Sequence, residues 1–164
     1  MTPDLFNTRI VEPTLQFMAA SPSIGIPVTD AARVEVMAIA GQESRWKYRK
    51  QIGGPAHSYW QFERGGGVAG LFSHPATKLK LGTVCAALDI EYDPDVVYQA
   101  MIWNDTLACA MARLLLYSDA APLPAVGDKE AGWAYYQRTW RPGLPHPEAW
   151  PGVYQQSLAA IGRA

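Results

Sequence analysis

Apolar side chains recur at helical spacing over one long stretch of the chain, from about Pro94 to Tyr117. This period is typical of the buried face of an amphipathic helix, and it predicts a single helix over the stretch. Asn104 is the one polar member of the stripe, either a satisfied core amide or an amide that lines a site. Strand patterns are sparse, so we predict a mainly α fold. The apolar members are Val97, Ala100, Met101, Leu107, Ala108, Met111, Leu114 and Leu115.

The remaining helices are expected at about residues 5–19, 30–43, 76–88, 129–140 and 152–161. Residues 46–70 lose the helical period and are rich in glycine, aromatic and polar residues. Within them, Ser58–Arg64 is expected to be extended or a β-hairpin arm, because glycine-rich turns precede and follow it. We therefore predict one domain over residues 1–164, mainly α, with a small irregular or β-hairpin segment around residues 46–70. That segment is where we expect a substrate groove.

The size and net charge of the chain limit which functions are plausible. A chain of 164 residues and 18.0 kDa is long enough for one domain with an adequate core. Its net charge of −1 provides no field to attract nucleic acid or an anionic membrane, so we expect neither as a partner. No apolar run is long enough to span a bilayer, and Met1–Asp4 lacks the basic and apolar regions of a secretory signal. We expect the protein to be made in the cytoplasm.

Cysteines and histidines predict neither a disulfide framework nor a metal centre. Cys85 and Cys109 lie in alanine-rich helical patterns, which favours buried free thiols over a bridge between them. The histidines are scattered and pair with no Cys-x-x-Cys motif, so no metal and no cofactor are expected. Gly65-Gly66-Gly67 lacks the following Lys-Ser/Thr of a phosphate-binding loop, which argues against nucleotide binding.

Glu43 is the candidate with the clearest physical signature. It lies in the last turn of the expected helix 30–43 and shares a face with Val36, Ile39 and Ala40. Apolar neighbours and the negative end of the helix dipole both disfavour its ionisation and would raise its pKa. A glutamate of raised pKa can act as a general acid near neutral pH. The alternative is a frayed helix end with Glu43 in water.

Three segments together resemble a known family. They are Gly41-Gln42-Glu43-Ser44-Arg45-Trp46, then Ser58-Tyr59-Trp60-Gln61-Phe62-Glu63, then Ala134-Tyr135-Tyr136-Gln137. In this order, over roughly residues 30–140, they look like the soluble lytic transglycosylase and goose-type lysozyme group of the lysozyme-like superfamily. The family has glycine, leucine and methionine where Ser58-Tyr59-Trp60 stands, and asparagine where Gln137 stands. Loss of that glycine affects how closely the backbone can approach a sugar.

The resemblance implies cleavage of the β-1,4 bond between N-acetylmuramic acid and N-acetylglucosamine in peptidoglycan. Glu43 would be the acid, with Ser44 beside it, and Gln61 would bind a sugar hydroxyl or acetamide. Glu63 stands where goose-type lysozymes carry an aspartate proposed to position water, which favours hydrolysis slightly over lytic transglycosylation. A solvated Glu63-Arg64 pair is the alternative.

Other residues complete the expected substrate site. Tyr136 would contact the acid or the sugar, unless it is a core residue, and Ser58 and Gln137 fill the altered family positions. Trp60 is our candidate for stacking on a sugar ring, because aromatic faces suit a polysaccharide groove. The basic cluster Arg45, Lys47, Arg49 and Lys50 would meet peptide carboxylates or wall phosphates, or is a solvated loop.

Two other functions remain open from the sequence. One is a non-catalytic virion or cell-wall-binding protein that only holds peptidoglycan glycan strands, a role that Ser58 and Gln137 favour. The other is a chitinase on the same fold. A product of a bacteriophage or prophage fits the family resemblance, and such a protein would reach the wall through lysis or as part of a virion.

Overall fold

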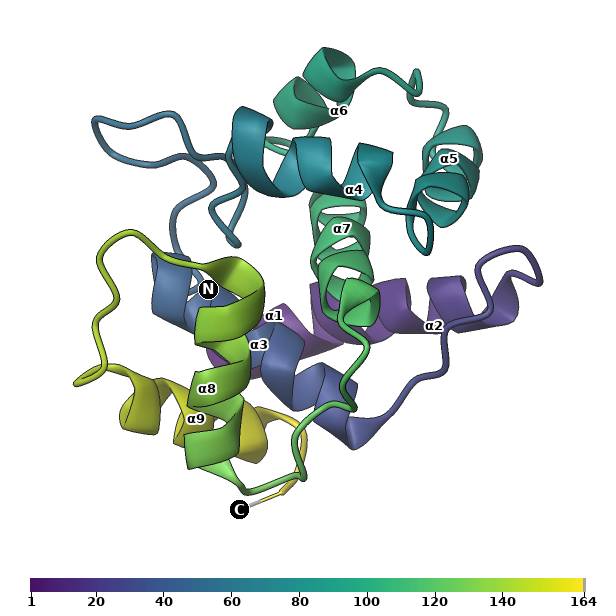
Figure 1. The fold of residues 1–164 in the computed structure, drawn as a ribbon. Helices are drawn as coiled ribbons and strands as arrows, with labels where there is room; N and C mark the ends of the chain where they lie inside the picture. Colours follow the sequence, from purple (N-terminus) through teal and green to yellow (C-terminus); the bar gives the residue numbers. More distant parts are fainter. Residues whose placement is uncertain (164) are drawn as a thin grey trace.

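The computed structural model describes residues 1–163, which are mainly α-helical and contain no strand. Figure 1 shows α4, α5 and α6 grouped on one side of the molecule, α3, α8 and α9 on the other, and α7 running between them. The elements in chain order are α1 (Pro3–Phe6), the π-helical turn η1 (Asn7–Val11), α2 (Glu12–Ala20), α3 (Asp30–Ser44), the π-helical turn η2 (Arg64–Val68), α4 (Ala69–Ser73), α5 (Lys78–Ala87), α6 (Pro94–Ala100), α7 (Asp105–Ser118), α8 (Lys129–Trp140) and α9 (Trp150–Ala160).

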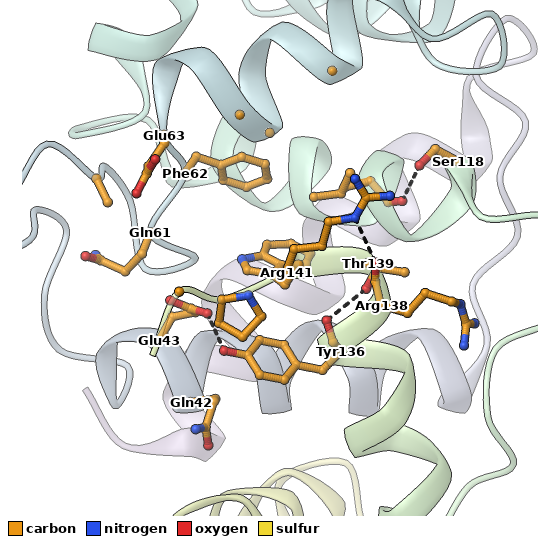
Figure 2. A pocket seen from close by; sticks show the side chains of 18 of the residues that line it. Gln42, Glu43, Gln61, Phe62, Glu63, Ser118, Tyr136, Arg138, Thr139 and Arg141 are labelled. Atoms are coloured by element: carbon orange, nitrogen blue, oxygen red, sulfur yellow. Dashed lines mark hydrogen bonds between the residues drawn. The ribbon is translucent and has the colours of Figure 1, made fainter. Parts of the chain in front are cut away.

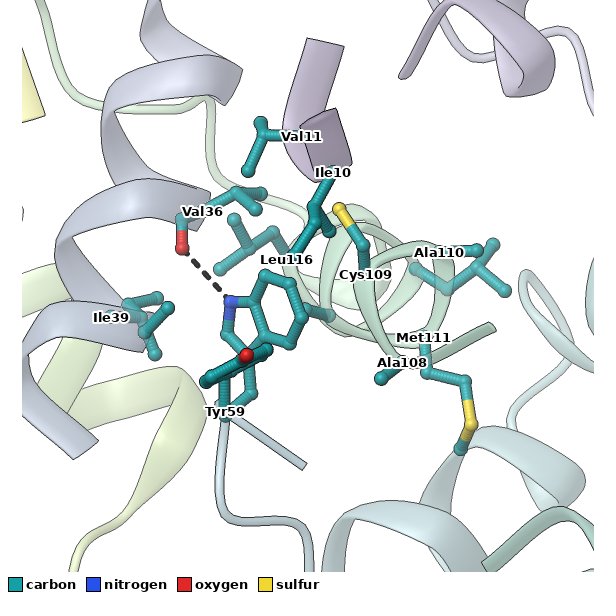
Figure 3. Packing of buried hydrophobic residues seen from close by; sticks show 14 of the residues in the cluster. Ile10, Val11, Val36, Ile39, Tyr59, Ala108, Cys109, Ala110, Met111 and Leu116 are labelled. Carbon is teal, nitrogen blue, oxygen red and sulfur yellow. Dashed lines mark hydrogen bonds between the residues drawn. The ribbon is translucent and has the colours of Figure 1, made fainter. Parts of the chain in front are cut away.

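Helix α3 is the central element. Thr29 caps it as the sequence predicts, with Oγ1 accepting from the Ala32 amide at 3.1 Å. Its apolar residues Val36, Ile39 and Ala40 are fully buried, and it contacts α7, α8 and α9. Figure 3 shows Val36 and Ile39 of this helix in the core with side chains from η1 and α7. The predicted helix at residues 30–43 is therefore confirmed, with its C-terminal end held against several neighbours.

The single helix predicted over Pro94–Tyr117 is wrong. The chain forms α6 and α7, separated by a turn at Met101–Asn104. Asn104 is neither a core amide nor a site-lining one: its side-chain oxygen accepts from the Leu107 amide at 2.9 Å and caps α7. Asparagine both breaks a helix and starts the next one in this way, while the apolar spacing continues across the break.

Residues 46–63 are irregular, as predicted, with two isolated antiparallel bridges, Lys50 with His57 and His57 with Phe62. His57 and Phe62 exchange backbone hydrogen bonds of 2.9 and 2.8 Å, which closes a hairpin-like turn. The prediction extended the irregular segment to residue 70, and this is wrong: η2 and α4 continue as helix through Ser73. Val68 and Leu71 are fully buried there, so core packing stabilises a helix that its glycines disfavour.

Cys85 and Cys109 are buried free thiols, as predicted. Within residues 1–163, no helix combines the length and the apolar character needed to cross a membrane.

Candidate active site

Glu43 lies in the last turn of α3, where the chain turns away sharply. Arg45 and Trp46 both have left-handed backbone conformations, with φ of 54° and 53°, and the Arg45 amide donates to Gly41 O at 2.8 Å. The Trp46 indole folds back and donates to Met37 O at 3.0 Å, over a face of the helix that is open because residue 41 is glycine. This reversal fixes the end of α3 and so the position of the Glu43 carboxyl.

Tyr136 reaches Glu43 from α8. Its hydroxyl donates to Glu43 Oε1 at 2.7 Å, as Figure 2 shows. The Tyr136 ring is buried and stacks on Trp150 of α9, with centroids 5.5 Å apart and planes 15° from parallel. The expected contact between Tyr136 and the acid is thus present, and the aromatic stack holds the donor in place.

The pKa of Glu43 is raised to about 7, first by burial. The negative charge of Glu63 acts in the same direction, whereas the hydrogen bond from Tyr136 lowers the pKa because it stabilises the carboxylate. A carboxyl group of this pKa is substantially protonated at neutral pH and can donate its proton. This is the electrostatic condition for a general acid.

Glu43 opens into a large cleft of about 1420 Å³. One side is formed by the hairpin-like segment and by η2 and α4, and the other by the end of α7, the C-terminal half of α8 and the loop that follows it. Its volume exceeds the roughly 300–1,000 Å³ of ordinary ligand pockets, as suits an extended substrate. A smaller pocket of about 280 Å³, between the end of α3 and the start of α9, shares Gln42, Glu43 and His146 with the cleft.

Glu63 and Gln61 line the same cleft as Glu43, and Figure 2 shows both above it. Glu63 is exposed, so the solvation expected in the alternative is present, but Arg64 pairs with Asp95 and not with Glu63. The Gln61 amide nitrogen donates to Ser58 O at 2.6 Å and to Tyr48 O at 3.3 Å. These bonds orient the side chain and leave its carbonyl oxygen without a donor among residues 1–163.

Trp60 does not line the cleft. It is fully buried, and its indole nitrogen donates to Val36 O at 2.9 Å, the hydrogen bond drawn in Figure 3. The expectation that it stacks on a sugar is therefore wrong, because neither face of the ring is open to a ligand. Ser58 is also buried, at 1% exposure, and its Oγ accepts from the Trp60 amide at 3.2 Å. Both residues are structural and shape the turn that carries Gln61.

Gln137 is not brought to the cleft, and Ser44 lines only the smaller pocket beside Glu43. Ser44 is buried, and its hydroxyl donates to Ala40 O at 3.0 Å within α3. Gln137 is exposed on α8 and is absent from the cleft lining. The expected substrate contact of Gln137 is therefore wrong, because the residues of α8 that line the cleft are Tyr136, Arg138, Thr139 and Trp140.

Trp140 is the cleft aromatic that the sequence did not single out. It is half-buried, lines the cleft, and donates from its indole nitrogen to Trp60 O at 3.0 Å. Its ring meets Phe62 edge to face, with centroids 5.3 Å apart. The aromatic-rich pattern around residue 140 was a signal for it, but sequence alone cannot separate a core tryptophan from one at a cleft wall.

Glycines form part of the opposite wall, at Gly66, Gly67 and Gly70. A side chain at Gly67 would overlap the Phe62 ring, but at Gly70 it would meet no atom within 4 Å, and at Gly66 only Glu63 Cβ at 3.8 Å. Neither Gly66 nor Gly70 has a left-handed backbone conformation. Packing therefore does not require glycine at these two positions, and their effect is to leave backbone open to the cleft.

Glu35 is a buried carboxyl that the sequence analysis missed. It is 1% exposed, its Oε2 has no hydrogen-bond partner among the described residues, and burial raises its pKa to about 8. It packs against Gly132 of α8. Among residues 1–163, no three His, Cys, Asp or Glu side chains gather as metal ligands would.

No protein-family model, curated protein or solved structure matches this chain significantly.

Proposed function

We propose that this protein is a peptidoglycan-cleaving glycosidase of the lysozyme-like kind, acting on the β-1,4 bond between N-acetylmuramic acid and N-acetylglucosamine. The observation that carries the proposal is the Glu43 carboxyl: its pKa is about 7, Tyr136 holds it at 2.7 Å, and it opens into a long cleft. Glycoside cleavage requires such a protonated carboxyl next to the scissile bond.

In the proposed mechanism, Glu43 donates its proton to the glycosidic oxygen as the bond to the anomeric carbon breaks. Tyr136 stabilises the carboxylate that results, because its hydroxyl already donates to Oε1. Positive charge develops on the sugar, and an oxygen nucleophile then adds to the anomeric carbon while Glu43 takes back a proton. Each turnover therefore returns Glu43 to its protonated form.

The nucleophile decides the product. Glu63 lines the same cleft and favours hydrolysis, with this carboxylate positioning the attacking water. In lytic transglycosylation the 6-hydroxyl of the sugar would attack instead and form a 1,6-anhydro ring. Trp140 replaces Trp60 as the proposed stacking residue, and Gln61 is proposed to accept a hydrogen bond from the sugar through its free carbonyl oxygen.

The test is mass spectrometry of fragments that the wild type and Glu43→Gln release from purified peptidoglycan. We expect reducing-end fragments from the wild type and a loss of about 10²- to 10⁴-fold in the variant, the range typical of general acid catalysis. Fragments lighter by one water would identify a transglycosylase. Cleavage of chitin oligomers alone would identify a chitinase, and no fragments with retained glycan binding would identify a binding protein.

We further propose action on the bacterial cell wall, after lysis or from a virion, as a bacteriophage or prophage product. The family resemblance of the three segments around Glu43, Gln61 and Tyr136 supports this origin.

A further inference from the structure

Arg138 and His146, which line the cleft, each have an acidic partner within the protein. Arg138 Nε donates to Asp119 Oδ2 at 2.7 Å, and His146 Nδ1 lies 3.2 Å from Glu148 Oε1. Among residues 1–163, no lysine lines the cleft. Arg141 differs, because within residues 1–163 no carboxylate lies within 4.0 Å of its side chain. It is the arginine in this lining that has no acidic partner.

The backbone holds Arg141 in an unusual conformation at the cleft wall. It ends α8 in the left-handed region, with φ of 52°, and its amide donates to Gln137 O at 3.1 Å. A residue with a side chain is disfavoured there by roughly 1–2 kcal/mol relative to a right-handed one. Its side chain makes one weak hydrogen bond, from Nε to Arg138 O at 3.4 Å, which leaves its terminal nitrogens available.

Arg141 lies on the same wall of the cleft as the residue that holds the acid. Trp140 ends α8 four residues after Tyr136, roughly 6 Å along the helix axis at 1.5 Å per residue, and Arg141 follows it. Tyr136 contacts Glu43, so Arg141 lies further along the same wall, directly after Trp140. A substrate that fills the cleft therefore passes both Glu43 and Arg141.

Resting on the proposed function, we propose that Arg141 binds the carboxylate carried by the muramic acid residue of the substrate. A guanidinium matches a carboxylate with two parallel hydrogen bonds and retains its charge at all relevant pH values. The carboxylate is either the free lactyl group or an acid of the peptide stem, and both offer the same chemistry. Chitin carries neither, so Arg141 is a specificity-determining residue that selects peptidoglycan over chitin.

The basic cluster singled out in the sequence does not serve this role in the cleft. Arg49 pairs with Asp105 at 2.7 Å, and Lys47 lies 5.0 Å from the centre of the Tyr48 ring. Arg45 reaches only the smaller pocket beyond Glu43. We therefore assign the expected contact with a substrate carboxylate to Arg141 and not to this cluster.

The experiment measures binding by isothermal titration calorimetry in a Glu43→Gln background, where no substrate is consumed. Four probes separate the sources: a GlcNAc–MurNAc tetrasaccharide with free lactyl groups, the same glycan with peptide stems, its lactyl methyl ester, and chitotetraose. The added substitutions are Arg141→Gln, Arg141→Lys to keep the charge, and Arg9→Gln. Arg9 is exposed on the N-terminal helix, outside the cleft, so it controls for the change in net charge.

We expect Arg141→Gln to weaken binding of the free-acid or the stem-bearing glycan by about tenfold, which corresponds to one charge-assisted contact. Binding of the methyl ester and of chitotetraose should change by less than about twofold, Arg141→Lys should restore part of the loss, and Arg9→Gln should have no effect. Whichever acidic probe loses affinity identifies the carboxylate.

An equal loss for all four probes, or no loss for either acidic glycan, would overturn the inference while leaving the proposed function intact. If the Glu43→Gln protein binds none of the four glycans, the proposed function itself fails, and the role of Arg141 fails with it.

Discussion

At the scale of single residues, Glu43 lies between two neighbours that shift its pKa in opposite directions. Tyr136 lowers the pKa through its hydrogen bond to the carboxylate, and Glu63 raises it through repulsion between like charges. Burial has the largest effect, and the resulting pKa of about 7 leaves roughly half of the Glu43 carboxyls protonated at pH 7. The proposed activity requires the protonated form and should fall as pH rises through this value.

The fall of kcat/KM with rising pH forms the alkaline limb of the pH profile, and its midpoint should follow the pKa of Glu43. Two substitutions should move this limb in opposite directions. Tyr136→Phe removes the bond that stabilises the carboxylate, so the pKa of Glu43 rises and the limb moves to higher pH. Glu63→Gln removes a negative charge, so the pKa falls and the limb moves to lower pH. Both variants should also be slower than the wild type. Profiles measured on solubilised glycan strands check this, and shifts in the same direction would contradict the account.

Glu35 predicts a pH-dependent stability. Its pKa is about 8 in the folded protein, against 4.5 for an ordinary glutamate. Between these values the unfolded chain has lost the proton that the folded protein retains, so stability falls as pH rises, by up to about 1.4 kcal/mol per pH unit. Below this window the contribution is fully present, and above pH 8 it is lost.

Glu35→Gln should remove this dependence, since a neutral amide of the same shape does not ionise. Urea unfolding between pH 5 and 8 should show that the free-energy difference between Glu35→Gln and the wild type grows steadily in favour of the variant. Glu43→Gln is the matched control, and its own gain should level off near pH 7, following the lower pKa of Glu43. Parallel curves for Glu35→Gln and the wild type would show that Glu35 is ionised in the folded state.

At the scale of elements, Gly70 near the start of α4 lowers the stability of this helix where it lines the cleft. Gly70→Ala fills open space in a helix and should raise the free energy of unfolding by roughly 0.5–1 kcal/mol. Gly70 lines the cleft, so the added methyl group would narrow it, and we expect glycan cleavage to fall several-fold although the protein is more stable. Thermal unfolding and cleavage assays on one preparation check both parts.

Gly65→Ala is the control, because Gly65 is exposed, has the same open surroundings and does not line the cleft. It should stabilise without loss of cleavage. Equal activities in the two variants would mean that the glycine wall makes no close contact with substrate.

Helices with a clear cap and a clear apolar face were predictable from the sequence. The range 30–43 and the helix at Lys129–Trp140 agree with the structure within a residue or two. The break before α7 was not predictable, because Asn104 fits the apolar period and also acts as a cap. The helix from Arg64 to Ser73 was also not predicted. Its three consecutive glycines are typical of a loop, whereas the burial of Val68 and Leu71, which stabilises the helix, is seen only in the folded structure.

The candidate site could be predicted in part. Glu43, Gln61, Glu63 and Tyr136 were selected from the sequence, and all four line one cleft. Trp60 was selected in place of Trp140, because ring burial depends on tertiary packing that no local pattern records. Arg141 and Glu35 were not selected from the sequence. Whether a charged side chain has a partner depends on which residues the fold brings next to it, and no local sequence pattern shows this.

At the scale of the whole molecule, the cleft lies where two groups of helices meet. The segment around Gln61 and Glu63, together with α4, forms one wall, and α8 forms the other, while α3 brings Glu43 to the cleft (Figures 1 and 2). A protonated acid therefore results from the assembly of elements far apart in the chain. This arrangement raises the pKa of Glu43 to about 7, so that much of the carboxyl stays protonated at neutral pH.

Carbon-13 NMR titration of the glutamate side-chain carboxyls measures this pKa, with Glu43→Gln to assign the resonance. We expect a midpoint at about pH 7 for Glu43. A midpoint near 4.5, the value of a solvated glutamate, would mean that Glu43 is a carboxylate at neutral pH and cannot serve as the acid.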